Sequence, residues 1–104
     1  MDSQVRYEQQ RVYVHGEMTV YTCGELKQQL LAQLTEHADA TELELSRVTE
    51  IDTAGLQILL AARRHAGDLG RTVRVVNPSR AIAEVLALCR LTESLVGTAP
   101  DAAR

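Results

Sequence analysis

The segment Glu42–Val76 constrains the fold more than any other part of this chain, because it has one strand-like stretch on each side of a helix-like stretch. Glu42–Ser46 alternates Glu with Leu, the period of a strand with one buried face. A helical pattern then runs from Asp52 to about Leu69, where Gly70 ends it, and Thr72–Val76 reads as a valine-rich strand. Such a unit forms a right-handed crossover between parallel strands. The segment therefore predicts an α/β fold.

Two strands and a helix are expected before this unit. Val5–Tyr7 and Arg11–His15 alternate polar and apolar residues, and the polar stretch Glu8–Gln10 between them predicts a hairpin turn. A helix is expected from Thr22 to about His37, because apolar residues recur every four positions at Leu26, Leu30 and Leu34.

Two helix starts carry capping signals. Thr22 and Glu25 have the spacing of a capping box, and Tyr21 and Leu26 occupy the positions of a hydrophobic staple. Ser79 is expected to cap a third helix. The core stripe of that helix is expected to contain Ile82, Val85, Leu86 and Cys89.

The order of elements is therefore β-β-α-β-α-β-α, followed by a short segment of unassigned type at Leu91–Val96. The hairpin is antiparallel and the crossover is parallel, so we expect a mixed sheet of about four to five strands with the helices mainly on one face. One α/β domain is expected over residues 1–97, with a flexible tail over residues 98–104.

Composition argues against several classes of function. The net charge of −3 and the scattered basic residues disfavour nucleic-acid binding. No apolar run approaches the roughly 20 residues of a membrane span, and the cysteines are too few for a secreted disulfide scaffold, so we expect a cytoplasmic protein without direct membrane insertion. The histidines are isolated, no phosphate-binding loop or nucleophile elbow is present, and Glu42 and Glu44 are interpreted as a solvated strand face. We therefore expect no enzyme, metal site or cofactor.

The candidate site is the junction between the strand at Glu42–Ser46 and the second helix. Val48 and Ile51 are interpreted as a short connection, after which Asp52–Gly55 opens the helix. A helix N-terminus presents unpaired N–H groups and a partial positive charge, so it can hold a phosphate or a carboxylate. A phosphate on Thr53 would lie there; alternatively, Thr53 is only the N-cap of the helix.

The second helix divides into two sides by angle, at about 100° per residue. Leu56 and Leu60 lie off the core stripe and are expected to be at least partly exposed. They suit a small partner-binding surface, or they pack beneath the connection at Val48–Ile51. Gly55 either belongs to that surface or lets the helix start pack closely on a neighbouring strand. The core stripe is expected to contain Ile58, Leu59, Ala62, Ala66 and Leu69.

The segment Ile51–Leu56 resembles the signature of the STAS domain family, in which a hydrophobic residue precedes Asp-Ser-Ser/Thr-Gly-Leu at the start of a helix. Gly16-Glu17 is similar to the Gly-Glu/Asp pair before the family's first helix, Leu43–Ser46 to its central strand, and Arg71–Asn77 to its fourth strand. The resemblance thus extends over nearly the whole chain and implies a STAS-like fold. It also implies a partner-binding surface made of Asp52, Thr53, Ala54, Gly55, Leu56 and Leu60.

Family members of the anti-sigma-factor-antagonist type bind a serine kinase that is also an anti-sigma factor, and that kinase switches them off by phosphorylating a hydroxyl in this motif. The resemblance implies a bacterial, non-enzymatic regulatory module that switches partners, with Thr53 as the candidate phospho-acceptor. The usual acceptor directly precedes the glycine, where this chain has Ala54. Either Thr53 is the acceptor, or phosphorylation does not regulate this motif.

The Asp-Thr-Ala-Gly sequence also resembles two other branches of the family. One contains stand-alone STAS proteins linked to chemosensory kinases, and the segment Gly16–Lys27 is more similar to this branch. The other is the soluble STAS subunit of the lipid-asymmetry ABC transporter, which docks on the ATPase. A small-ligand or lipid-sensing domain is a third interpretation, but the Leu-, Val- and Ala-rich core leaves no obvious room for an apolar pocket.

Overall fold

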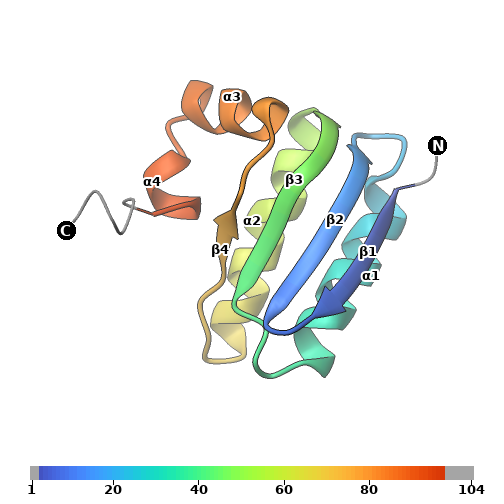
Figure 1. Ribbon diagram of the computed structural model, residues 1–104, viewed down its shortest axis with the longest axis vertical. Coiled ribbons are helices and arrows are strands. Elements are labelled where there is room, and N and C mark those ends of the chain that lie inside the picture. Colours follow the sequence, from blue (N-terminus) through green and yellow to red (C-terminus); the bar gives the residue numbers. More distant parts are fainter. Residues whose placement is uncertain (1–2, 98–104) are drawn as a thin grey trace.

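The computed structural model describes residues 3–97 (Figure 1). Its elements follow the expected order β-β-α-β-α-β-α, and the unassigned segment forms a short fourth helix. The bounds are β1 Gln4–Glu8, β2 Arg11–Met18, α1 Cys23–Glu36, β3 Glu42–Ile51, α2 Thr53–Asp68, β4 Arg74–Val76, α3 Arg80–Leu88 and α4 Thr92–Leu95. The expected tail at residues 98–104 lies outside the described residues.

The strands form one mixed four-stranded sheet in the order β1-β2-β3-β4. β1 and β2 are antiparallel, and Gln9 and Gln10 form the turn between them with positive φ angles of 46° and 73°. β3 is parallel to both β2 and β4. Two crossovers of the same hand place α1 and α2 on the same face of the sheet (Figure 1), as expected.

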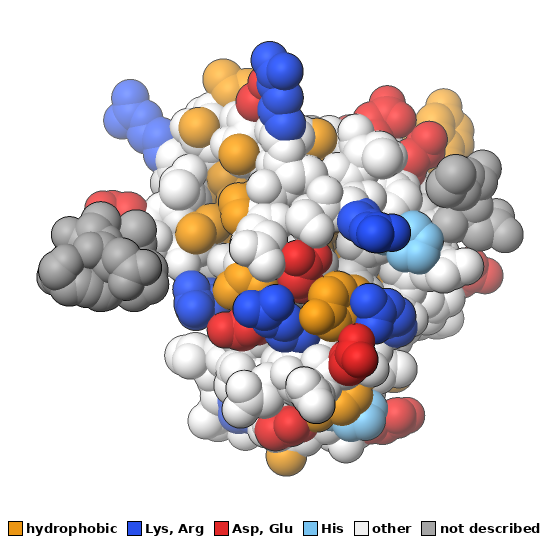
Figure 2. All heavy atoms as spheres, in the orientation of Figure 1, with side chains coloured by type: hydrophobic (Ala, Val, Ile, Leu, Met, Phe, Trp, Pro, Cys, Tyr) orange, Lys and Arg blue, Asp and Glu red, His pale blue; other side chains and the backbone are white. Residues whose placement is uncertain are grey.

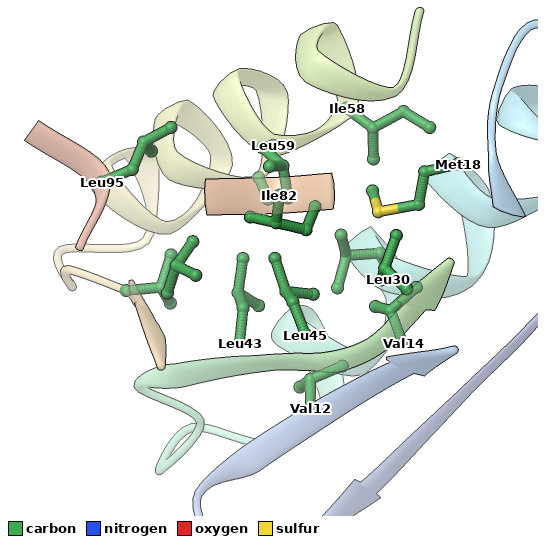
Figure 3. Close-up of a cluster of buried hydrophobic side chains, with 14 of the residues drawn as sticks. Val12, Val14, Met18, Leu30, Leu43, Leu45, Ile58, Leu59, Ile82 and Leu95 are labelled. Atoms are coloured by element: carbon green, nitrogen blue, oxygen red, sulfur yellow. The ribbon is translucent and has the colours of Figure 1, made fainter. Parts of the chain in front are cut away.

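The hydrophobic core fills the space between the sheet and the helices. Leu43 and Leu45 of β3 point toward Leu59 of α2, and Ile82 of α3 points into the same cluster (Figure 3). α3 and α4 therefore extend the helical layer instead of covering the opposite face. The largest fully buried side chains are Met18, Leu26, Leu30, Leu34, Leu43, Leu45, Leu59, Ile82, Leu86, Leu95, Val12 and Val14.

The opposite face of the sheet is polar, and Figure 2 shows basic and acidic side chains gathered over the strands on this side. Glu42 lies here and pairs with Arg11 at 2.7 Å. The interpretation of Glu44 as a solvated carboxylate is wrong, because Glu44 is only 8% exposed. Its oxygens accept hydrogen bonds from Asn77 Nδ2 at 2.9 Å and from the amide and hydroxyl of Ser46.

β3 is longer than the alternation of Glu and Leu indicated, since Val48 and Ile51 belong to the strand and not to a connection. The pairing of β2 with β3 shifts register between Tyr13 and His15. Because of this irregularity, the buried residues Leu45 and Val48 are three positions apart and not two. The alternation typical of a strand is therefore lost after Leu45, and the second half of β3 could not be predicted from it.

The end of α2 follows the sequence signal. Gly70 has φ +77°, and the N–H of Arg71 donates to the carbonyl of Ala66 at 2.8 Å, as in a Schellman motif. Ser79 caps α3 by accepting a hydrogen bond from the N–H of Ile82 at 3.2 Å. Within residues 3–97, no helix is both long and apolar enough to cross a bilayer.

Three expectations about the helices are wrong. Thr22 precedes α1 but makes no side-chain cap, so the capping box with Glu25 does not form. Tyr21 is 92% exposed and therefore cannot form a staple with Leu26. Leu69 and Cys89 are exposed C-caps, because α2 and α3 each end before the core stripe reaches these positions.

Candidate functional site

The predicted junction lies where the parallel strands β2 and β3 end and α1 and α2 begin. Asp52, between β3 and α2, is the N-cap of α2, and its Oδ1 accepts a hydrogen bond from the N–H of Gly55 at 3.1 Å. The alternative that Thr53 is the N-cap is therefore wrong, since Thr53 is the first residue of the helix. The capping role moves to Asp52 because its carboxylate reaches the N–H three residues ahead.

Asp52 also connects the helix start to the loop between β2 and α1. Its Oδ2 accepts a hydrogen bond from the N–H of Val20 at 3.0 Å, and its own N–H donates to the carbonyl of Met18 at 3.2 Å. The hydrogen bonds from Val20 and then Gly55 hold the pKa of the Asp52 carboxyl below its ordinary value. The folded state thus favours an ionised Asp52 that joins two segments distant in the sequence.

Gly55 is required by close packing. A Cβ at this position would lie 2.0 Å from the carbonyl oxygen of Met18 and 2.9 Å from Cγ1 of Ile51. A side chain therefore cannot fit unless the backbone of β2 or α2 moves. This confirms the structural alternative for Gly55, in which the helix start packs against the end of a neighbouring strand.

Thr53 and Ala54 lie in the first turn of α2 at the surface. Thr53 is exposed and Ala54 is half-buried. The hydroxyl of Thr53 makes no hydrogen bond to any other residue between 3 and 97. The structure thus brings Asp52, Thr53 and Ala54 together at one accessible helix start.

The two leucines predicted to be exposed differ from each other. Leu56 is only 8% exposed and belongs to the core, so the prediction for Leu56 is wrong. Leu60 is half-buried and packs against the edge of the core, as predicted. The angular pattern of α2 predicted one buried stripe facing the sheet. In the structure α2 also packs against α1, so its buried side is wider and includes Leu56.

The sequence did not indicate two exposed apolar residues beside this site. Val20 is 60% exposed and Tyr21 is 92% exposed, and both lie in the loop that Asp52 holds through the Val20 N–H. Tyr21 was instead assigned to a hydrophobic staple with Leu26, because an apolar residue directly before a helix also suits that role. Between residues 3 and 97, no group of three or more His, Cys, Asp or Glu side chains is arranged to hold a metal ion.

Known proteins with this fold include proteins described as anti-sigma factor antagonists. A proposed anti-sigma factor antagonist from Thermotoga maritima aligns with a TM-score of 0.73 and 18% identity, over 90% of this chain and 83% of that one. SpoIIAA in its unphosphorylated form aligns with a TM-score of 0.59 and 15% identity, over 83% of this chain and 82% of that one. The phosphorylated form of SpoIIAA from Bacillus aligns with a TM-score of 0.60 and 16% identity, over 97% of this chain and 95% of that one. At these identities the likeness shows a shared fold.

The family assignment comes from sequence. No curated protein matches the chain. A family model described as "Mlab, STAS domain", however, matches residues 2–97, which include every strand and helix described above. The capped and tightly packed helix start at Asp52–Gly55 lies within this match. The chain therefore belongs to the STAS domain family.

Proposed function

We propose that the chain is a non-enzymatic regulatory module that binds a protein partner at the start of α2. The docking face consists of Val20, Tyr21, Thr53, Ala54 and Leu60. The observation that carries this proposal is the 3.0 Å hydrogen bond from Val20 N–H to Asp52 Oδ2, which holds two exposed apolar residues beside the helix start. An exposed tyrosine with apolar neighbours is typical of the centre of a small protein interface.

Asp52, Gly55 and Leu56 support this face without forming most of its surface. Asp52 fixes the loop to α2, Gly55 permits the close approach to Met18, and Leu56 anchors the first turn in the core. These three residues were predicted to contact the partner; we propose instead that they position the residues that do. Substitution of these residues would change the shape of the docking face as well as the stability of the fold.

Phosphorylation of Thr53 is the switch that we propose for this face. A phosphate adds about −1.5 to −2 charges at neutral pH. On Thr53 it would lie beside the ionised carboxylate of Asp52 and would compete for the N–H groups of the first turn. The resulting repulsion would disturb the loop at Val20 and Tyr21. SpoIIAA, which has the same fold, is known in unphosphorylated and phosphorylated forms. The corresponding partner is a serine kinase that is also an anti-sigma factor, or a related chemosensory kinase.

A second candidate function is that of a STAS subunit bound to the ATPase of a lipid-asymmetry ABC transporter. Ala54 favours it, because the hydroxyl that antagonists carry before the glycine is missing here. The matching family model also carries the Mlab description and not that of an anti-sigma factor antagonist. In this case Thr53 is a surface residue of a permanent interface and is not modified.

The test is an affinity capture of the tagged chain from its own cells, followed by intact-mass measurement of the recovered chain. Wild type is compared with Tyr21→Ala and Thr53→Ala, and Leu88→Ala serves as the control because Leu88 is exposed on α3 outside the docking face. We expect one partner to be retained by wild type and the control but lost from Tyr21→Ala. A kinase together with one added phosphate on Thr53 supports the antagonist function.

An ABC ATPase with unmodified Thr53 supports the second candidate. Equal retention of the partner by Tyr21→Ala and wild type would contradict the docking face itself. Folding of each variant is checked by thermal unfolding, so that loss of the partner is not confused with loss of structure.

A further inference from the structure

The polar face of the sheet is organised in rows of residues that pair across the strands. In one row, Arg11 and Arg74 both pair with Glu42, at 2.7 and 3.4 Å. In the next row, Arg6, Tyr13, Glu44 and Val76 lie side by side. In a third row, Gln4 pairs with His15 and His15 with Arg47. The first row has one glutamate between its two arginines, whereas the third row contains basic but no acidic residues.

A hollow of about 370 Å³ opens between the second and third rows. It lies at the register shift between β2 and β3, where an irregularity turns side chains away from the regular alternation. Its volume falls within the range of small-molecule sites, about 300–1,000 Å³. The polar side chains that line it are Arg6, Tyr13, His15, Glu44, Ser46 and Arg47.

The acidic residue of the hollow is already satisfied by the protein. Burial raises the pKa of Glu44, but hydrogen bonds from Asn77 and from the amide and hydroxyl of Ser46 outweigh this and hold the pKa below its ordinary value. Glu44 is therefore an ionised group whose oxygens accept three hydrogen bonds from Asn77 and Ser46. These three hydrogen bonds occupy most of the acceptor sites of the carboxylate.

The basic residues of the hollow are differently arranged. Arg6 lies over the ring of Tyr13, 4.1 Å from its centroid, and pairs with the exposed Glu8 at the rim. Among residues 3–97, neither Arg47 nor His15 makes a side-chain hydrogen bond or an ion pair. The hollow thus lies between two guanidinium groups, of which Arg6 is paired with Glu8 whereas Arg47 is bound to no side chain or backbone group between residues 3 and 97.

We propose that this hollow binds a small oxyanion, a carboxylate or phosphate group of a small molecule, between Arg6 and Arg47. A guanidinium presents paired donors that match a carboxylate or phosphate. His15 lies in the same hollow and adds a hydrogen-bonding group, whereas the hydroxyl of Ser46 already donates to Glu44. The site lies on the polar face of the sheet, apart from the core and from the docking face, so it does not depend on the proposed function.

The experiment is an NMR titration of the ¹⁵N-labelled chain with pyrophosphate and, separately, with citrate, at constant ionic strength. We expect saturable shifts of the amides of Arg6, His15, Ser46 and Arg47. Loss of one charge-assisted contact in Arg47→Gln or Arg6→Gln should weaken binding about tenfold. Arg80→Gln removes the same charge from an exposed pair with Glu84 on α3 and should leave the affinity unchanged.

The two probes distinguish the sources of the anion. Tighter binding of pyrophosphate indicates a phosphate ligand, and tighter binding of citrate indicates a carboxylate ligand. Non-saturating shifts, or equal weakening by Arg80→Gln and Arg47→Gln, would overturn the proposal, because both indicate general attraction between anions and basic side chains. Thermal unfolding of each variant verifies that the sheet is intact.

Discussion

The starts of α1 and α2 lie at the ends of neighbouring parallel strands, yet they are built in opposite ways. At α2, the Asp52 carboxylate caps the helix and Gly55 packs against the carbonyl of Met18. At α1, the Thr22 hydroxyl accepts a hydrogen bond from Thr19 N–H at 3.0 Å and donates to the carbonyl of Glu17 at 2.8 Å. The hydroxyl of Thr22 is therefore used inside the loop and does not cap its helix.

The difference shows that the start of α1 depends on the start of α2. The loop before α1 is held partly by its own hydrogen bonds and partly by Asp52 through the Val20 N–H. The start of α2 is held by its own cap and by packing on β2. The α2 start is thus the fixed part of the docking face, and the α1 loop carries exposed side chains on that support.

Substitution Gly55→Ala should produce the largest effect, because the new Cβ would meet the Met18 carbonyl at 2.0 Å. We expect a loss of about 3 kcal/mol or more in the free energy of unfolding, measured by urea denaturation. Gly67→Ala is the matched control in the same helix, because a Cβ there meets nothing within 4 Å. It should stabilise by about 0.5–1 kcal/mol. Similar effects of the two variants would show that the close packing at Gly55 is absent in solution.

Substitution Asp52→Asn should have a smaller effect that depends on pH. The amide of Asn can still accept from Gly55 N–H, but its NH₂ group cannot accept the hydrogen bond from Val20 N–H. The folded state lowers the pKa of Asp52, so its contribution is present above the ordinary value of 3.8 and is lost as the pH falls through the folded value.

The difference in melting temperature between wild type and Asp52→Asn should therefore be largest at neutral pH and should shrink toward about pH 3. The pKa of Glu44 is also lowered, but this residue is common to both proteins and its contribution cancels in the comparison. A difference that stays constant over this range would contradict the ionised cap.

Substitution Glu25→Ala should have the smallest effect, because Glu25 is exposed in the first turn of α1 and no capping box forms. We expect a change within about 0.5 kcal/mol. Thr22→Ala should cost about 1 kcal/mol or more, since it removes the hydrogen bonds inside the loop. A double-mutant cycle measures their coupling, and a coupling above about 0.5 kcal/mol would show that the box forms after all.

Much of the fold could be predicted from local patterns. The hairpin, the crossover between β3 and β4, and the Ser79 and Gly70 signals are confirmed. Several of the errors occur where a residue's partner is distant in the chain. The Asp52 contact to Val20 joins positions 32 apart, and the Glu44 contact to Asn77 joins positions 33 apart. Leu56 is buried because two helices pack together, which the angular pattern of one helix does not contain.

The sequence by itself determined the order of the elements, the core-facing leucines of α1 and the start of α2 at Asp52–Gly55. These features depend on periodicity and on hydrogen bonds between residues a few positions apart, which are written in the local order of side chains. Only the tertiary structure decided which side chain caps which helix, which leucine of α2 is buried, and that the loop with Val20 is hydrogen-bonded to Asp52. It also formed the hollow on the polar face, since a register shift between two strands exists only once they are paired.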